Sequence, residues 1–331
     1  MLSYRYLFTK VASFFASFAL RDLVRSIARV KSDKELDHTV RSGRKAFDTI
    51  RFWLKDNANV EKKKRVKMAG CWVYEYVPKS GANNDRIAIF FHGGGFIIGG
   101  DASHGALVSD MAYHLDCRVF LVEYPLAPES KIKNSIDRCV EVIDAIRQVT
   151  KCQYYTLVGS SAGGTMVYQS VISLIKNKKE MPTAIYLVAP VIQHCFSFDK
   201  ETYARFYKTD EILGRCYQYL MENDSDRHKA VNLLGGLEVP ELLSTDKLLL
   251  KKFPVTHVTY QVDEVLSAEN KEFIQQLRDA GITVVDNSVD KSFHSFPIYN
   301  YLPHTQEFLQ HISADFQKRI NDTKKSAKPN G

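Results

Sequence analysis

Long apolar runs and paired cysteines are both missing from this 331-residue sequence. The apolar run Val11–Leu20 is only ten residues long, about half of what a membrane-spanning helix needs. The six cysteines are scattered and form no C-x-x-C pair, so we expect neither a disulfide framework nor a zinc site. Scattered cysteines of this kind are typical of buried free thiols and favour a reducing compartment.

A large excess of one charge is missing from most of the chain as well. The formal net charge is +7, but residues 1–67 carry 17 Lys and Arg against 7 Asp and Glu. The rest of the chain is therefore slightly acidic. We expect the basic residues to belong to a solvated linker and to helix faces, the alternative being a surface that approaches anionic lipid headgroups. No nucleic-acid-binding motif accompanies the charge, so no nucleic-acid partner is predicted.

Two glycine-rich motifs are the most informative feature that is present. His92–Phe96 reads HGGGF, and Gly159–Gly164 reads GSSAGG. The second contains G-x-S-x-G, formed by Gly159, Ser161 and Gly163, a pattern that places a serine on a sharp turn between a strand and a helix. The glycines of the first leave backbone N–H groups able to face a developing negative charge. Together the motifs predict a serine hydrolase.

Both motifs lie at the ends of expected β-strands. Ile87–Phe91 and Tyr155–Val158 are short apolar runs rich in β-forming residues, and each ends where the glycines begin. After Ser161, apolar residues recur at helical spacing up to Ile175. A strand, a tight turn and a helix are the context that G-x-S-x-G requires. The serine is therefore predicted to be a nucleophile rather than part of a surface turn.

The rest of the chain alternates expected strands with expected helices. Further strands are expected over Cys71–Pro78, Cys117–Tyr124, Ala184–Val188, Thr256–Val262 and Ile282–Asp286, and helices over 129–149, 267–280 and 303–320. This alternation predicts an α/β fold with a doubly wound, mostly parallel sheet and helices on both faces. Ligands of such sheets bind at the carboxyl ends of the strands, where both glycine motifs fall.

These motifs resemble those of the hormone-sensitive-lipase-like branch of the α/β-hydrolases, which includes many carboxylesterases and arylacetamide deacetylases. A third motif, EYPLAPE at Glu123–Glu129, is similar to that family's EYRLAPE segment, and the resemblance extends from about Ile87 to about Phe316. Pro125 stands where the family usually has arginine, and Ser160 stands where it usually has aspartate. Both departures lie beside the expected chemistry, so they concern substrate preference and local support.

The resemblance and the chain order together predict a catalytic triad of Ser161, Asp263 and His294. A serine hydroxyl needs a neighbouring base, and the base needs a carboxylate that orients it. In this fold the three follow in the order Ser, Asp or Glu, His. Asp263 directly follows an expected strand and matches the family's acid position, with Glu264 as the alternative. His294 lies in SFHSF, similar to the family's H-x-F segment, whereas the alternative His304 lies inside the expected closing helix.

The motif positions of the family also imply an oxyanion hole. The backbone N–H groups of Gly94, Gly95 and Ala162 would form it. His92 is expected to brace the glycine loop through hydrogen bonds, and the motifs are further supported by Gly93, Gly159 and Gly163. No metal ion and no organic cofactor are expected, because the triad and the amides supply nucleophile, proton transfer and charge stabilisation.

The N-terminal residues admit three interpretations. Apolar residues between Leu7 and Ile27 lie three or four apart with arginines on another side, the pattern of an amphipathic helix. In the resembling family an N-terminal helical segment helps to roof the active site, and some members are anchored to a membrane there. We expect a roof helix first, peripheral membrane contact through residues 1–30 second, and a cleaved secretory signal last. The expected location is cytoplasmic or at an intracellular membrane.

The expected organisation is one α/β core with a helical cap. Residues 1–65 are an N-terminal helical cap segment, and the aromatic-rich residues 191–253 are a helical cap insertion. The two parts of the core are residues 66–190 and 254–320. Residues 321–331 are polar and charged, and they are expected to be a disordered tail.

The predicted function is hydrolysis of carboxylic esters through an acyl-enzyme on Ser161. The expected partner is a small-molecule ester with a short to medium acyl group and an apolar alcohol or aryl part. The alternatives are a membrane-associated lipase or a steryl or arylacetamide deacetylase, and a non-catalytic ligand-binding receptor on the same fold. Retention of a candidate base at His294 argues against the receptor.

Overall fold

The computed structural model describes residues 17–192, 209–210, 212–233 and 251–326. The strands are β1 (Val60–Lys62), β2 (Val66–Met68), β3 (Cys71–Pro78), β4 (Asn83–Phe91), β5 (Cys117–Glu123), β6 (Tyr154–Ser160), β7 (Ala184–Val188), β8 (Val255–Gln261) and β9 (Val284–Val289). The helices are one over residues 17–29, α2 (Asp33–Asp48), α3 (Asp101–Leu115), α4 (Ile132–Thr150), α5 (Ala162–Lys176), α7 (Gly214–Glu222), α8 (Asp224–Leu233), α10 (Ser267–Asp279) and α11 (Pro303–Ser326), with the short 3₁₀ helices η1 (Thr49–Trp53) and η2 (Phe296–Ile298).

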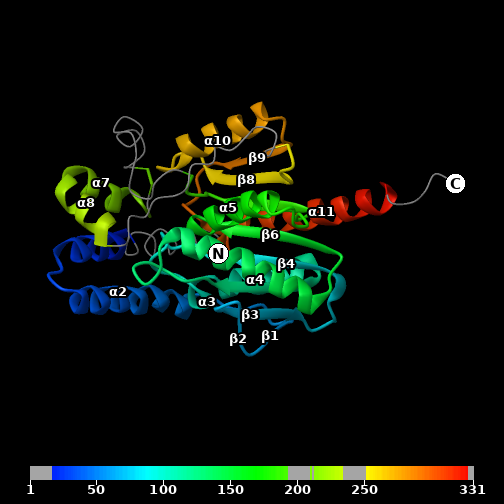
Figure 1. The fold of residues 1–331 in the computed structure, drawn as a ribbon, viewed down its shortest axis with the longest axis horizontal. Coiled ribbons are helices and arrows are strands. Elements are labelled where there is room, and N and C mark those ends of the chain that lie inside the picture. The colour runs from blue at the N-terminus through cyan, green and yellow to red at the C-terminus, as the bar shows by residue number, and fades with distance from the viewer. Residues whose placement is uncertain (1–16, 193–208, 211, 234–250, 327–331) are drawn as a thin grey trace.

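The strands of the described residues form one nine-stranded sheet in the order β1-β3-β5-β4-β6-β7-β8-β9, with β2 paired to β3. Strands β4 to β9 pair in parallel, whereas β1, β2 and β5 are antiparallel to β3. The predicted α/β fold with a mostly parallel sheet is therefore confirmed. The carboxyl ends of β4, β6 and β8 point to the end of the molecule where α2, α7 and α8 lie (Figure 1).

Helices cover both faces of the sheet, and successive residues of β4 alternate between the two faces. Ile87, Ile89 and Phe91 pack in a core that includes side chains of α4, α5 and α10, whereas Ala88 and Phe90 pack in a core that includes side chains of α3 and α11. All five side chains are completely buried. Burial on both faces explains why this strand has a continuous apolar run rather than an alternating pattern.

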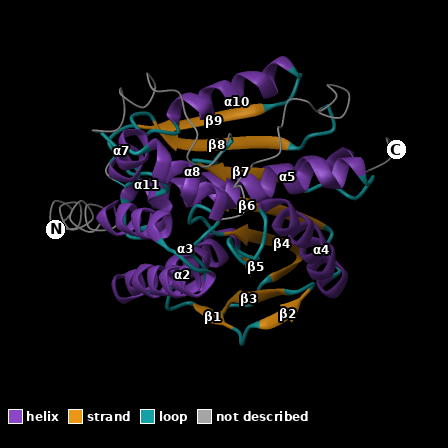
Figure 2. Cartoon of the chain, turned by 60° about the vertical axis from the view of Figure 1, so that its left-hand side comes forward, coloured by secondary structure: helices purple, strands orange, loops and turns teal. Residues whose placement is uncertain are grey.

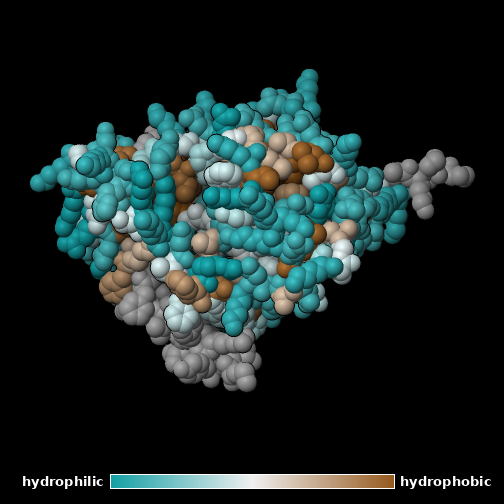
Figure 3. Space-filling model, turned by 90° about the horizontal axis from the view of Figure 1, so that it is seen from below, coloured by the Kyte–Doolittle hydropathy of each residue, from teal (hydrophilic) through white to brown (hydrophobic). Residues whose placement is uncertain are grey.

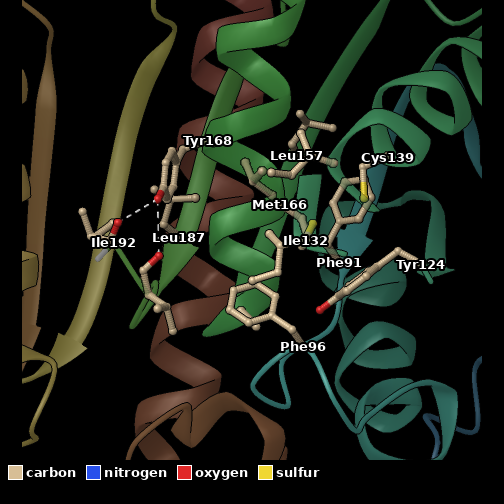
Figure 4. Close-up of a cluster of buried hydrophobic side chains, with 14 of the residues drawn as sticks. Phe91, Phe96, Tyr124, Ile132, Cys139, Leu157, Met166, Tyr168, Leu187 and Ile192 are labelled. Carbon is tan, nitrogen blue, oxygen red and sulfur yellow. Dashed lines mark hydrogen bonds between the residues drawn. The ribbon is translucent and has the colours of Figure 1, made fainter. Parts of the chain in front are cut away.

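Figure 4 shows the first of these two cores. Phe91 and Leu157 from the sheet lie among Met166 of α5 and Ile132 and Cys139 of α4, and Figure 2 shows α4 and α5 alongside the sheet. Cys139, like the other cysteines that the structure describes, is a buried free thiol. Its contacts are those of a small apolar side chain, so it serves packing.

The helix over residues 17–29 and α2 form part of a cap at the carboxyl ends of the strands. The apolar face of the first helix turns inward, since Val24 and Ile27 are completely buried. At Gly43 of α2, a Cβ atom would lie 2.5 Å from Cδ1 of Leu23, so glycine allows the two helices to approach closely. This packing agrees with the roof helix that was expected first among the three interpretations. Residues 1–16 lie outside the described residues.

The expected domain limits need two corrections. Residues 60–62, expected in the helical cap segment, form β1, which pairs with β3 from Val60 opposite Pro78. The basic residues that follow Val60 resemble a linker in the sequence, but an edge strand tolerates them because its outer side is solvated. Residues 321–326, expected to be disordered, continue α11, where Lys324 pairs with Asp85 at 3.1 Å.

The expected cap insertion over residues 191–253 is described in part. Its described residues include the helices α7 and α8, which agrees with a helical insertion. Tyr217 of α7 is buried, and Tyr219 donates a hydrogen bond to Asp226 of α8. Other aromatic residues of this insertion, which were expected to help roof the site, lie outside the described residues; they are Phe196, Phe198, Tyr203, Phe206 and Tyr207.

The surface seen in Figure 3 is mostly hydrophilic, with small and separate apolar patches. Large apolar side chains are nevertheless exposed in places, among them Phe52 and Trp53 of η1. Within the described ranges, no helix combines the length and the apolar character that crossing a bilayer requires.

Candidate active site

Ser161 lies at the sharp turn between β6 and α5, as the G-x-S-x-G motif predicts. Its backbone has φ 52° and ψ −120°, a conformation that costs a non-glycine residue free energy and persists only where the surroundings hold it. The amide of Ser161 donates to the carbonyl of Val188 at 2.7 Å, and its carbonyl accepts from the amide of Gly164 at 2.8 Å. The turn is thus fixed on both sides, and the hydroxyl projects into a cavity that Ser161 lines.

The glycines around Ser161 are required by close packing. A Cβ atom on Gly159 would lie 2.3 Å from the carbonyl oxygen of Gly163, and one on Gly163 would lie 2.0 Å from that of Phe91. Both distances are far below van der Waals contact. The motif therefore allows the turn, the start of α5 and the end of β4 to come together at one point.

His294 is in position to act as the base for Ser161. Its Nε2 lies 3.1 Å from Oγ of Ser161, and the ring is buried. It belongs to the loop between β9 and η2, as the sequence predicts. His304 lies in α11 with its ring against Phe296, so it serves packing there.

The carboxylate beside His294 belongs to Glu264, and the predicted Asp263 is wrong. Oε2 of Glu264 lies 2.5 Å from Nδ1 of His294, and its Oε1 accepts from the amide of Gln261 at 3.2 Å. Glu264 is completely buried. The side chain of Asp263 is exposed, and its backbone carbonyl accepts from the hydroxyl of Thr209.

The turn that follows β8 explains the correction. Gln261 ends the strand, and the amide of Glu264 donates back to its carbonyl at 3.4 Å. The chain therefore reverses within four residues, which directs the side chain of residue 263 to solvent and that of residue 264 inward. Asp and Glu can both orient a histidine base, so residue type does not distinguish them. The geometry of so short a turn has no periodic pattern in the sequence. The apolar Val265 and Leu266 that follow, both buried, are the one sequence signal that favours burial on the side of Glu264.

The environment of His294 favours its charged form overall. Burial lowers the pKa of His294, but the negative charge and the hydrogen bond of Glu264 raise it, and the net shift is upward. Asp210 adds to this field. It holds the start of α7 by accepting from the amides of Ile212 and Leu213, and its other oxygen accepts from the amide of Val265. The cap helix and the loop that carries Glu264 are thus joined through one carboxylate.

The glycines of HGGGF form a ribbon beside Ser161. Gly94 has φ 122° and Gly95 has φ 60°, values that L side chains rarely adopt. The carbonyl of Gly94 accepts from the amides of Ile97 and Ile98 at 3.1 and 3.0 Å, while within the described part of the chain the amides of Gly94 and Gly95 donate no hydrogen bond. Those two amides border the same cavity as Ser161. The two amide donors are therefore placed to stabilise an anionic oxygen that forms in this cavity.

Two buried histidines hold this ribbon. Burial lowers the pKa of His92 to about 4, so its ring is neutral and its Nδ1 donates to the carbonyl of Gly93 at 2.8 Å. This contact is a hydrogen bond of the kind expected from His92 toward the glycine loop. His104 of α3 accepts from the amide of Gly93 at its Nε2, so its Nδ1 carries the proton that is donated to Ser103. His104 has no counterpart in the sequence motifs and was missed.

Of the two departures from the resembling family, Ser160 directly precedes Ser161, and Pro125 lies in the loop between β5 and α4. Oγ of Ser160 is 3.0 Å from Oγ of Ser295, so the residue before the nucleophile supports the residue after the base. The carbonyl of Pro125 accepts from the hydroxyl of Ser135 in α4 at 2.6 Å. Within the described residues, these hydrogen bonds go to Ser295 and Ser135 and not to Ser161.

A cavity of about 460 Å³ lies between the Ser161 turn and the cap. Its walls come from the helix over residues 17–29, from α2 and η1, from α7 and from the glycine ribbon. Its described lining includes no Asp, Glu, Lys or Arg side chain and is dominated by apolar ones, among them Leu20, Leu23, Phe47, Ile98, Val191, Leu213 and Leu266. Such a site favours an uncharged, largely apolar ligand. The described residues contain no cluster of His, Cys, Asp and Glu that could hold a metal ion.

The chain belongs to a family of the α/β-hydrolase fold, whose model matches residues 88–298. An esterase of Acinetobacter venetianus is 24% identical over 242 residues, which cover 71% of this chain and 76% of the relative. A putative α/β hydrolase of Acanthamoeba polyphaga mimivirus, R526, is 24% identical over 262 residues, which cover 75% of this chain and 71% of the relative.

Solved structures agree with this assignment. An esterase from the bacterial hormone-sensitive lipase family superimposes with a TM-score of 0.67 at 20% identity, covering 92% of this chain and 98% of the other. A mutant of the esterase E40 gives a TM-score of 0.73 at 20% identity, covering 90% and 96%. The predicted membership of the α/β-hydrolases is confirmed by the family match, and the solved structures show that the chain shares its fold with an esterase of the bacterial hormone-sensitive lipase family.

Proposed function

We propose that this chain cleaves uncharged carboxylic esters, with Ser161 as nucleophile, His294 as base and Glu264 as the acid that orients the base. The observation that carries the proposal is the continuous hydrogen-bonded series from Glu264 through His294 to Ser161 beside an apolar cavity. A serine, an imidazole and a carboxylate in this order are the requirements of nucleophilic acyl transfer.

In the first step, Oγ of Ser161 attacks the ester carbonyl carbon while Nε2 of His294 accepts the hydroxyl proton. Glu264 stabilises the imidazolium that forms. The carbonyl oxygen becomes an oxyanion, which the amides of Gly94, Gly95 and Ala162 stabilise. Each such donor typically contributes about 3 kcal/mol in the transition state.

In the second step, the tetrahedral intermediate collapses and the ester C–O bond breaks. His294 gives its proton to the departing alcohol, and the acyl group remains on Ser161. Water then attacks the acyl-enzyme, with His294 again accepting and returning the proton. Free acid and free Ser161 are regenerated, so the scheme requires neither a metal ion nor a cofactor.

The cavity lining supports a substrate with an apolar, uncharged acyl group. We expect kcat/KM for nitrophenyl butyrate to exceed that for the mono-nitrophenyl ester of succinic acid by at least about 100-fold. The two acyl chains have the same length, but the second would carry a carboxylate into an unpaired, apolar environment, which costs several kcal/mol. Initial rates with both substrates provide the measurement. Equal values of kcat/KM would contradict the proposed substrate class.

The acid side of the pH profile reports on His294. Only the neutral imidazole can accept the proton of Ser161, and the pKa of His294 is raised above its ordinary value of 6.5. The rate at which a fluorophosphonate labels Ser161 is therefore expected to fall as the pH drops through a midpoint above 6.5. In Glu264→Gln the effect of burial, which lowers the pKa, is no longer opposed by a carboxylate. Its midpoint should shift to lower pH, whereas the midpoint of Asp263→Asn should stay where it is.

A further inference from the structure

We propose that Arg44 is a positioning residue that couples the cap helix α2 to the glycine ribbon, so that contact of an acyl chain with the cap aids the chemical step. The inference rests on the proposed ester hydrolysis and adds a regulatory link between the two walls of its site. Arg44 has no place in the sequence motifs.

Arg44 reaches from α2 to two loops that flank the ribbon. Its Nε donates to the carbonyl of Ile97 at 2.8 Å, and its Nη2 donates to the carbonyl of Ala127 at 2.8 Å. Both oxygens of Glu129 accept from the same guanidinium, at 2.7 and 2.8 Å. One planar side chain thus holds three residues from two segments that are far apart in the sequence.

The two carbonyls belong to residues that themselves hold the ribbon. The amide of Ile97 donates to the carbonyl of Gly94, and the amide of Ala127 donates to the carbonyl of Phe96 at 2.8 Å. Gly94, Gly95 and Phe96 all have positive φ, at 122°, 60° and 65°. Such a run requires support from its surroundings, since a residue like Phe96 is strained there. Arg44 is part of that support.

The same turn of α2 also faces the cavity. The cavity is lined by Gly43, which precedes Arg44, and by Ala46 and Phe47, which follow it two and three residues later. A helical turn is about 5 Å long and is held together by its own backbone hydrogen bonds, so a contact on one side of the turn also restrains the other side. An acyl chain that packs against Ala46 and Phe47 therefore stabilises the position of α2 from which Arg44 holds the ribbon. Binding free energy gained remote from the reacting carbonyl is then used to arrange the oxyanion donors.

The carbonyl bonds carry this effect more than the ion pair does. The side chain of Glu129 is 54% exposed and that of Arg44 is 24% exposed, and exposed ion pairs contribute little because water screens them. The carbonyls of Ile97 and Ala127 need two donors in a fixed, planar arrangement. An arginine supplies it, and a lysine does not.

The test compares Arg44→Lys and Arg44→Ala with Arg41→Ala, using the full chain and nitrophenyl acetate, butyrate and hexanoate. Arg41 lies one turn earlier on α2, is exposed and pairs with Asp37 of the same helix, so its loss leaves the ribbon contacts intact.

We expect both Arg44 variants to lower kcat on hexanoate about tenfold with little change in KM. On acetate, whose acyl group is too short to reach the cap, kcat should change less than threefold. Arg41→Ala should match the unmodified chain throughout, and Glu129→Gln should change kcat less than threefold.

Two results would overturn the inference. One is a loss of kcat that is equal on all three esters in the Arg44 variants, which indicates a general structural role. The other is agreement of the Arg44 variants with Arg41→Ala on every ester.

Thermal unfolding by circular dichroism identifies any variant that is not folded, and Arg44→Lys then serves in place of Arg44→Ala. If Ser161→Ala retains turnover, the proposed function itself fails; if that variant is inactive and the Arg44 variants are unaffected, only the coupling fails.

Discussion

Replacing Ser161 by alanine should lower kcat for nitrophenyl butyrate by about 10⁶-fold, to the level left by binding and oxyanion stabilisation alone. In the proposed mechanism Oγ of Ser161 forms the acyl bond, and the hydroxyl of the neighbouring Ser160 donates to Ser295 instead of contacting His294. The measurement is a steady-state assay at high enzyme concentration, together with labelling by a fluorophosphonate probe. The variant should not be labelled.

Ser160→Ala is the matched control for this experiment. Its hydroxyl is on the neighbouring residue and bonds to Ser295 rather than to His294. We expect it to retain labelling and to lose no more than about tenfold in kcat, because it supports the loop without taking part in bond formation. Turnover by Ser161→Ala at a rate within tenfold of the unmodified chain would remove Ser161 from its role.

Replacing Glu264 by glutamine should lower kcat by about 10⁴-fold, while Asp263→Asn should leave kcat within about twofold. The loss follows from the pairing of Glu264 with Nδ1 of His294 at 2.5 Å. An amide in its place cannot stabilise the imidazolium and favours the wrong tautomer of the ring, an effect of this size in the well-studied serine protease triad. Asp263 is exposed and lies outside this hydrogen-bonded series.

The pair of variants discriminates between two adjacent carboxylates with the same ordinary chemistry. Each substitution removes one carboxylate from the same loop, but only Glu264 contacts His294, so a difference in kcat between the variants reports on the buried carboxylate beside the base. Purified variants are compared in kcat and in the rate of fluorophosphonate labelling. A large loss in Asp263→Asn with near-normal activity in Glu264→Gln would reverse the assignment. Equal, small losses in both would show that His294 needs neither carboxylate.

The elements that the sequence predicted best are those with strong local patterns. Strands β3 and β7 begin and end at the expected residues, and α10 begins at the expected Ser267 and ends one residue earlier than expected. β7 is a parallel strand buried along its whole length, and its residues form a continuous apolar run. β3 pairs antiparallel and is only partly buried, but it is rich in β-forming residues and lies between Gly70 and residues 79–81. The last strand, β9, begins two residues later than the expected Ile282, because it carries Asp286 and Asn287 and has little apolar pattern.

The two short strands β1 and β2, each paired with β3, show the opposite case. Val60 and Val66 stand within a run of lysines and arginines, so the sequence resembles a linker. The strands exist because β3 offers an edge with unpaired backbone groups, and such pairing depends on the partner strand rather than on the short segment itself.

At the candidate site, the residues proposed as nucleophile and base and the glycine ribbon could be predicted from the sequence and the family resemblance. Ser161 and its glycines are determined by local steric limits, since a Cβ at Gly163 would meet the carbonyl of Phe91 at 2.0 Å. Because only glycine fits at such a position, this steric limit is visible in the sequence. His294 follows from chain order, because the fold places the base after the last strand, and from the resemblance of SFHSF to the family's H-x-F segment.

Only the tertiary structure decided which carboxylate meets His294, which histidine supports Gly93 and which arginine ties the cap to the ribbon. Glu264, His104 and Arg44 act through contacts with residues 30, 11 and 53 or more positions away. Many sequences satisfy such contacts with other residue types, and the direction of a side chain in a short turn has no periodic signature. A steric limit at one backbone position restricts which residue can stand there, so the sequence shows it. A long-range contact forms only when the sheet and its cap pack together, so the sequence does not show it.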